Sequence, residues 1–272
     1  MMHARHLTVV TVLFWTAALG CVTNPNTGEH VPAALTEDNQ INLGRTLAPE
    51  FEKHFGGKLS NTAVQEYVRH VGLRIGTATT ERRLPYEYIV LNSSVPGTHS
   101  LPGGKVYITS GLMKALNSER ELAAALAHET GHVMALHGLI HLQEQQISVP
   151  EIVRTSFGSD ADGKPIGSPS RVLDILTSIS HPPAHERQAD DYAMVIMDRV
   201  GYNPIGLVEL LQTLKAVRES NPGLMADMSR CHPLTRSRLE WAQSAVGRYG
   251  EAQDRSADWN GAEFQKIKEL LK

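Results

Sequence analysis

The sequence predicts an α+β fold that is mainly helical, with one small antiparallel sheet. Apolar residues recur every three or four positions along most of the chain, which is the period of amphipathic helices. Two short segments, 86–91 and 105–110, are instead rich in aromatic and β-branched residues and are predicted to be strands. The 272 residues, 41% hydrophobic and 20% charged, suit one globular core. A net charge of -3 without a basic block argues against a nucleic-acid partner.

The amino-terminal segment differs from the rest of the chain. A short basic start precedes an apolar run from Leu7 to Leu19, which is too short to span a bilayer and suits a secretion signal. The Gly-Cys pair that follows resembles a bacterial lipobox. Residues 1–21 are therefore predicted to be a lipoprotein signal with Cys21 as the lipidated residue, and Val22 resembles the outer-membrane sorting pattern. A plain cleaved signal and an uncleaved anchor are the alternatives.

The first helices follow a tether. Residues 22–35 are rich in Pro, Asn and Gly and are predicted to link the signal to a domain over 36–272. Thr36 is expected to begin a helix, because acidic residues in the next turn suit the positive end of the helix dipole. A second helix is predicted over 61–75. Its buried stripe is expected to be Val64, Tyr67, Val68, Val71 and Ile75.

Turn and cap residues place the next elements. The "LPGG" segment, 101–104, is expected to turn the chain into the second strand. Ser118 and Glu121 form a capping box, so a helix is predicted from there to about Gln146. Further helices are expected over about 171–179, 186–200, 204–219, 233–247 and 258–271.

The helix after Ser118 contains "LAHETGHVMALH". His128 and His132 are four residues apart and lie on one helical face, so both can bind one metal ion. Glu129 completes an HExxH arrangement, in which the glutamate is not a ligand but takes a proton from metal-bound water. The alternative is an Ala-rich helix whose polar residues face solvent or form hydrogen bonds within the protein core.

A catalytic zinc site needs a third protein ligand. The metzincin position, six residues after His132, holds Gly138 and excludes that class. The predicted helix has no break that would bring a nearby ligand back, so His137 and His141 are expected on the helix surface.

The segment "HERQADDYA" supplies a better candidate. Glu186 can bind the ion while Asp190, four residues on, accepts a hydrogen bond from a liganding histidine and fixes its tautomer. Ala189 is small enough to let this helix approach another closely. His185 points about 100° away from Glu186 and is not assigned as a ligand. The alternative is a solvated acidic face.

"HETGH" followed by "ERQADDYA" resembles the zinc peptidase family that includes the CAAX prenyl endopeptidase and HtpX, particularly its periplasmic lipoprotein-type members. The blocks "LPGGKVYITSGLM", "GYNPIGLVELLQTL" and "HPLTRSR" extend the resemblance over nearly the whole chain after Cys21. It implies a gluzincin, zincin-like domain with one zinc ion bound by His128, His132 and Glu186. It also makes "KVYITS" the edge strand beside the active-site helix, along which an extended peptide would pair.

The block "CHPLTRSR" matches the family's His-Pro-x-x-x-x-Arg pattern at His232 and Arg238, which implies a catalytic or regulatory role for both. His232 either donates a hydrogen bond to the reaction's oxyanion or binds zinc as a fourth ligand that blocks the enzyme. A structural histidine at a helix start is the alternative. Cys231 is expected to be buried, with a thiolate ligand as a second reading and a disulfide to an unmodified Cys21 as a third.

The resemblance implies a zinc endopeptidase that cleaves misfolded or stalled periplasmic and outer-membrane proteins. It would be anchored by lipid to the inner leaflet of the outer membrane of a Gram-negative bacterium, with the outer-membrane assembly machinery as a partner. The alternative is a non-proteolytic, zinc-containing chaperone or assembly factor. Glu129 argues against that alternative, because a structural zinc site needs no base and is usually closed by four protein ligands.

Overall fold

The protein is described from a computed structural model. The described residues are 21–23, 30–32, 36–79, 84–159, 161–163, 167–249 and 261–271. Residues 1–20 of the predicted signal and most of the tether lie outside this set. Strand β1 (Cys21–Thr23) pairs antiparallel with β2 (His30–Pro32), and only the backbone of these two strands is described.

The main sheet has three strands in the order β3-β5-β4, and it is mixed. β5 (Lys105–Thr109) runs parallel to β3 (Glu87–Leu91) and antiparallel to β4 (Thr98–Leu101). The α+β prediction is confirmed, but the expected antiparallel pairing of the two predicted strands is wrong. "KVYITS" is the central strand and not the edge strand, because β4 folds back onto it through a turn with φ of +82° at Gly103 and +100° at Gly104.

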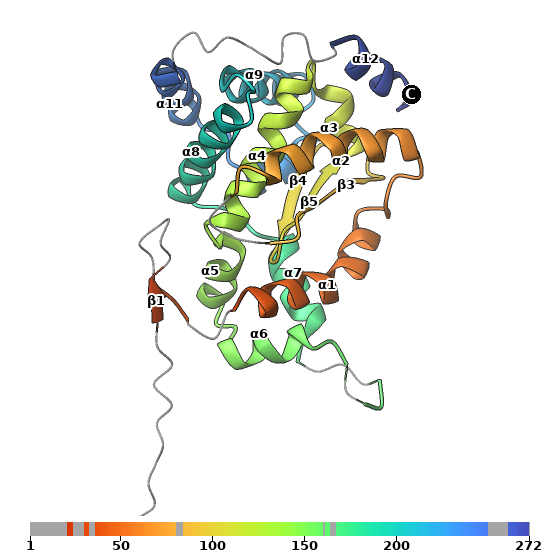
Figure 1. The fold of residues 1–272 in the computed structure, drawn as a ribbon, viewed down its shortest axis with the longest axis vertical. Coiled ribbons are helices and arrows are strands. Elements are labelled where there is room, and N and C mark those ends of the chain that lie inside the picture. The colour runs from red at the N-terminus through yellow and green to blue at the C-terminus, as the bar shows by residue number, and fades with distance from the viewer. Residues whose placement is uncertain are drawn as a thin grey trace, which may run out of the picture.

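Helices surround this sheet on both faces (Figure 1). They are α1 (Glu37–His54), α2 (Thr62–Gly76), α3 (Ser110–Ala115), α4 (Glu119–Met134), α5 (His137–Glu144), α6 (Val149–Ser156), α7 (Pro169–Thr177), α8 (Pro183–Arg199), α9 (Ile205–Ser220), α10 (Ala226–Cys231), α11 (Arg236–Val246) and α12 (Gly261–Glu269). Thr36 caps α1 as predicted, because its side chain accepts a hydrogen bond from the backbone N–H of Asn39 at 3.2 Å. Within the described part of the chain, no helix combines the length and the apolar character needed to cross a membrane.

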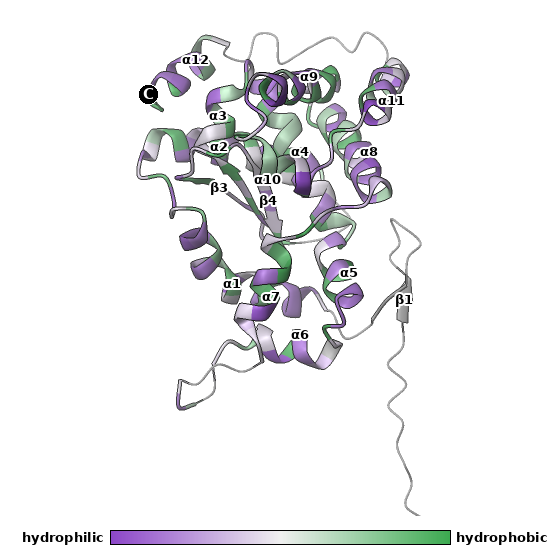
Figure 2. Ribbon diagram, turned by 180° about the vertical axis from the view of Figure 1, so that it is seen from behind, coloured by the Kyte–Doolittle hydropathy of each residue, from purple (hydrophilic) through white to green (hydrophobic). Residues whose placement is uncertain are grey.

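The sheet separates two hydrophobic cores. Alternate strand residues face opposite sides. Val90 and Ile108 join the larger core, which includes apolar residues of α2, α4, α8 and α9, whereas Ile89, Leu91 and Tyr107 join the smaller core with residues of α1, α5, α6 and α7. Figure 2 shows hydrophobic segments toward the interior and hydrophilic ones on the outer helices such as α6. The predicted stripe of α2 is buried in the larger core, as expected.

Helix α4 ends earlier than the sequence predicts. Ser118 caps it, accepting a hydrogen bond from the N–H of Glu121 at 3.2 Å, as the capping box requires. The helix then stops at Met134, and Leu136 adopts a left-handed backbone with φ of +64°. A left-handed conformation costs a residue with a Cβ about 1–2 kcal/mol, and leucine otherwise favours helices, so the sequence gives no signal of the break.

Candidate metal centre and active site

The centre forms where α4 and α8 touch. A Cβ added at Gly131 would lie 2.9 Å from the carbonyl oxygen of Ala189, so the two backbones approach as closely as they can at this point. The prediction that Ala189 permits a close helix contact is confirmed, since its side chain is fully buried. Helices α4 and α8 lie side by side (Figure 1), and the contact brings the first turn of α8 close to the histidines of α4.

The predicted ligands converge on one point. Nε2 of His128 and Nε2 of His132 are 3.0 Å apart. The carboxylate oxygens of Glu186 lie 3.3 Å from Nε2 of His132 and 3.7 Å from Nε2 of His128. His232, just after α10, places Nδ1 2.9 Å from Glu186 Oε1 and 3.3 Å from His128 Nε2. Ligand atoms of these four buried residues all lie within 4.8 Å of one another.

A carboxylate and a guanidinium hold the metal-ligating side chains in place through hydrogen bonds. Nδ1 of His128 is 2.9 Å from Asp190 Oδ1. Arg238 of α11 donates to both oxygens of Asp190, at 2.6 and 2.7 Å, and also to Glu186. Although burial opposes it, the guanidinium lowers the pKa of Asp190, and with His232 it holds the pKa of Glu186 well below its usual value. Both carboxylates are therefore ionised around neutral pH.

These residues fit a divalent metal ion. Nδ1 of His128 is hydrogen-bonded to the ionised Asp190, which orients the ring so that its Nε2 faces the same point as Nε2 of His132. Burial and the neighbouring His181 lower the pKa of His132 well below its usual value, which keeps that ring neutral. Two imidazole nitrogens and a carboxylate are the donor set of a catalytic metal site with an open position.

Glu129 is buried beside this centre. Its Oε1 is buried, makes no hydrogen bond within the described part of the chain, and lies 3.2 Å from Nε2 of His232. Burial disfavours a charge on His232, but Glu186 and Glu129 outweigh it and raise the pKa of His232 to about 9. His232 thus bridges the metal-binding group and the expected base. Cys231 is buried next to it and belongs to neither group of metal-ligating side chains found among the described residues.

The surface prediction for His137 is wrong. The break at Leu136 turns the chain, so His137 is fully buried and its Nδ1 lies 2.8 Å from Nδ1 of His132. Its Nε2 lies 2.7 Å from Oε1 of Gln188, a contact that no motif indicated. His141 is partly exposed and lies 3.5 Å from a carboxylate oxygen of Glu144.

Two more histidines pack against this group. His185 is buried and stacks on His137, with ring centroids 4.0 Å apart, and as predicted it is not in the metal-ligating group. The ring of His181 lies 4.0 Å from that of His132. Sequence reasoning did not single out His181, which follows α7 in an irregular segment and carries no periodic signal.

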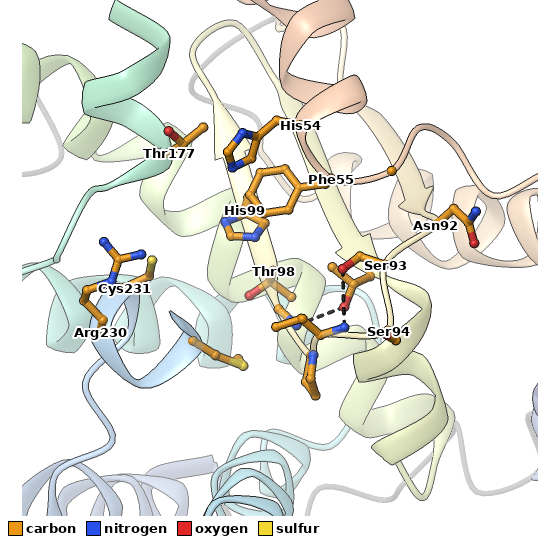
Figure 3. A pocket seen from close by; sticks show the side chains of 16 residues that line it. His54, Phe55, Asn92, Ser93, Ser94, Thr98, His99, Thr177, Arg230 and Cys231 are labelled. Carbon is orange, nitrogen blue, oxygen red and sulfur yellow. Dashed lines mark hydrogen bonds between the residues drawn. The ribbon is translucent and has the colours of Figure 1, made fainter. Parts of the chain in front are cut away.

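A pocket of about 400 Å³ adjoins the centre at the beginning of β4 (Figure 3). It is lined by the 92–97 loop and β4 on one side and by α10 with Cys231 on the other. Phe55 and His99 pack at 4.4 Å between ring centroids and form one wall. Burial, with smaller contributions from His232 and His54, lowers the pKa of His99 to about 3, so this wall is neutral at physiological pH.

Known proteins match most of the chain. The family model described as "Peptidase family M48" matches residues 59–246. The "Beta-barrel assembly-enhancing protease" of Escherichia coli (strain K12) is 23% identical over 233 residues, 82% of this chain and 47% of that protein. The "Mitochondrial metalloendopeptidase OMA1" of Schizosaccharomyces pombe is 25% identical over 183 residues, 66% of this chain and 53% of that protein.

A shorter relative also matches. The "Metalloprotease YcaL" of Escherichia coli (strain K12) is 26% identical over 165 residues, 60% of this chain and 63% of that protein. This chain spans about half the length of the first two relatives. The family model covers more than half of the chain and includes both helices that build the metal centre. The chain therefore belongs to peptidase family M48.

Proposed function

We propose that this chain is a zinc endopeptidase in which His128, His132 and Glu186 bind one zinc ion. The observation that carries the proposal is the convergence of two imidazole nitrogens and one carboxylate beside a buried glutamate that is not in the metal-ligating group. Nitrogen and carboxylate ligands with an open position are typical of catalytic zinc. Bound zinc supplies Lewis acidity that activates a water and polarises a carbonyl.

The protein's own groups divide the remaining work. Glu129 takes the proton of the attacking water and delivers it to the leaving amide nitrogen. Asp190 holds the ring of His128, and Arg238 holds both Asp190 and Glu186 in place. His232 occupies the position from which a side chain either donates to the oxyanion or takes the fourth place on the metal.

The sheet supports a peptide substrate. Within the described part of the chain β4 pairs only with β5, so no strand occupies its other edge, along which an extended peptide would pair. Main-chain pairing of this kind reads little side-chain identity and suits unfolded or misassembled proteins. The pocket at the beginning of β4 would receive one substrate side chain.

Replacing Glu129 by Gln tests the activity. Zinc content and casein cleavage are measured on the chain from Val22, with and without the substitution. One zinc ion in both proteins with cleavage in the parent only is expected, because Gln keeps the shape and loses the base. Zinc in both with equal cleavage would contradict the role of Glu129. Zinc in both proteins without cleavage in either would point to an enzyme blocked by His232 or to a zinc-containing chaperone or assembly factor, and cleavage by His232→Ala would distinguish the two.

We further propose that Cys21 is lipidated, which would place the domain in the periplasm at the inner leaflet of the outer membrane of a Gram-negative bacterium. The lipobox-like Gly-Cys pair and the relative described as "Beta-barrel assembly-enhancing" support this location, with unfolded envelope proteins as substrates and outer-membrane assembly machinery as partner. Cells fed an alkyne fatty acid should label the parent and not Cys21→Ser. Equal labelling of the two proteins would exclude this anchor.

A further inference from the structure

The two metal-binding histidines have different partners on the sides of their rings that face away from the metal. Nδ1 of His128 meets the carboxylate of Asp190 at 2.9 Å. Nδ1 of His132 instead meets another imidazole, Nδ1 of His137, at 2.8 Å. A metal-binding histidine needs such a partner, because the bond to its second nitrogen fixes the tautomer and the ring orientation.

We propose that His137 is a positioning residue that accepts a hydrogen bond from Nδ1–H of His132, and that Gln188 holds His137 in the tautomer able to accept it. The proposal rests on the proposed function in one respect, which is that His132 binds the metal through Nε2.

Once Nε2 of His132 binds the metal, the proton positions along this series follow from the geometry. Nε2 of His132 faces His128 and Glu186, so it offers its lone pair and the single proton of the neutral ring is on Nδ1. Nδ1 of His137 must then accept, which places the proton of His137 on Nε2. That nitrogen lies 2.7 Å from Oε1 of Gln188, an amide oxygen that can only accept. Each donor therefore faces an acceptor along the whole series from His132 through His137 to Gln188.

The surroundings keep His137 neutral. It is fully buried and stacks on His185 with an angle of 8° between the ring planes. Its Nε2 faces the amide oxygen of Gln188 and its Nδ1 faces Nδ1 of His132, so one ring nitrogen has an acceptor opposite it and the other a donor. A protonated His137 would carry hydrogen on both ring nitrogens and would oppose the Nδ1–H of His132.

The break in the helix makes this contact possible. On a continuous α-helix a residue five positions on is rotated by about 140°, so His137 would point away from His132. The left-handed Leu136 ends α4 and starts α5, and it returns the His137 ring to the inner side of the centre. The strained residue thus has a definite structural result beside the metal-binding group.

A second metal ion is the competing interpretation. Ligand atoms of His132, His137 and His181 also lie within 4.8 Å of one another. A cation there would need a lone pair on Nδ1 of His132, and therefore an imidazolate bridging two metals. The separation of 2.8 Å falls in the range of hydrogen bonds, about 2.7–3.2 Å.

Two substitutions of His137 separate hydrogen bonding from shape. In His137→Asn the side-chain oxygen stands near the place of Nδ1 and can accept, whereas His137→Phe keeps a ring without an acceptor. Gln188→Leu leaves His137 in place and removes the group that fixes its tautomer. His141→Phe, on the same helix and outside the centre, is the matched control.

The readouts are zinc affinity, measured by competition with a chromophoric chelator, and the ¹⁵N signals of the His132 ring in the zinc-loaded protein. His137→Phe should weaken zinc binding by about 10–100-fold. His137→Asn should recover most of this loss, Gln188→Leu should show a smaller loss, and His141→Phe should match the parent. The Nδ1–H signal of His132 should persist in the parent and in His137→Asn.

Several results would overturn the proposal. Unchanged affinity in His137→Phe would show that His137 does not position His132, and equal losses in the Phe and Asn variants would leave only a role in shape. If His137→Phe does not fold, the other two variants still test the proposal. Unchanged zinc affinity in Gln188→Leu together with weaker zinc binding in His137→Asn would exclude the hydrogen-bonded series from Gln188 through His137 to His132. Two zinc ions in the parent and one in His137→Phe would establish the second metal site instead. A parent that binds no zinc would contradict the proposed function itself.

Discussion

His232 is the residue whose position most directly affects access to the metal centre. It contacts the carboxylate of Glu186 through one ring nitrogen and lies 3.2 Å from Glu129 through the other. Its Nδ1 belongs to the same compact set of ligand atoms as His128 and Glu186. This arrangement favours the fourth-ligand interpretation over a structural role at a helix start.

Substitution of His232 by Ala should therefore raise casein cleavage while the protein keeps one zinc ion, because the place taken by the imidazole becomes open to substrate. Initial rates and zinc content of the two proteins check this. A fall in kcat of about 10²–10³-fold would instead assign His232 to oxyanion stabilisation. Equal rates would return it to a structural role.

The residues of the centre were predictable where their positions depend on local geometry. Helical spacing of four residues was enough to predict that His128 and His132 share a face, and that Glu186 and Asp190 share another. The place of His137 depends on a left-handed leucine that only the tertiary structure stabilises, so spacing alone predicted the wrong side. His181 lies in an irregular segment whose path no periodicity indicates.

Helices α4 and α8 meet through Gly131 and Ala189, and this contact sets the distance between the histidines and Glu186. A Cβ at Gly131 would lie 2.9 Å both from the carbonyl oxygen of Ala189 and from Cβ of Tyr192. A side chain at Gly131 could therefore be accommodated only if α8 moved away from α4. The position thus links the packing of two elements to the geometry of the metal centre.

Gly131→Ala should lower the free energy of unfolding by about 1–3 kcal/mol through overpacking, and it should weaken zinc binding. Helix propensity alone would favour alanine by about 1 kcal/mol, so a loss must come from the contact. Denaturant unfolding and chelator competition measure the two effects. Gly138→Ala is the control, because its Cβ would meet only Cδ2 of Leu176 at an ordinary 3.5 Å. Equal behaviour of the two variants would contradict the argument.

At the scale of elements, strands β3 and β5 and most of the amphipathic helices lie where they were predicted, whereas the helix after Ser118 ends early and β4 was missed. The stripe of α2 and the cap of α1 follow from side-chain periodicity and local hydrogen bonds. Strand β4 has only four residues, with His99 and Ser100 in the middle, and shows no apolar alternation. Missing it also reversed the assignment of the edge strand, since sheet order depends on long-range pairing.

The whole molecule keeps several imidazoles neutral in its interior. The pKa is lowered to about 3 for His99 and His137 and to about 2 for His181, in each case chiefly by burial. An unfolded histidine titrates near pH 6.5. Below that pH these histidines bind protons in the unfolded chain but not in the folded protein. The free energy of unfolding therefore falls as the pH falls from about 6.5 toward 3.

His99→Phe should reduce this pH dependence. A single such histidine loses at most about 2 kcal/mol of stability between pH 7 and pH 5, and the partly exposed edge of His99 makes this an upper limit. Phenylalanine keeps the packing on Phe55 and cannot titrate. Urea unfolding of the zinc-free proteins at both pH values compares them, and identical losses in parent and variant would contradict the prediction.

Helix α4 has almost no surface of its own: every residue except Arg120 is buried, and it packs on α2, α8, α9, β4 and β5. Its backbone amides cannot meet solvent by local fraying, so their hydrogen exchange requires opening of the whole domain. The loops and outer helices can therefore open locally while the two histidines of α4 keep their positions. Heat inactivation of the centre should accordingly follow cooperative unfolding of the entire domain.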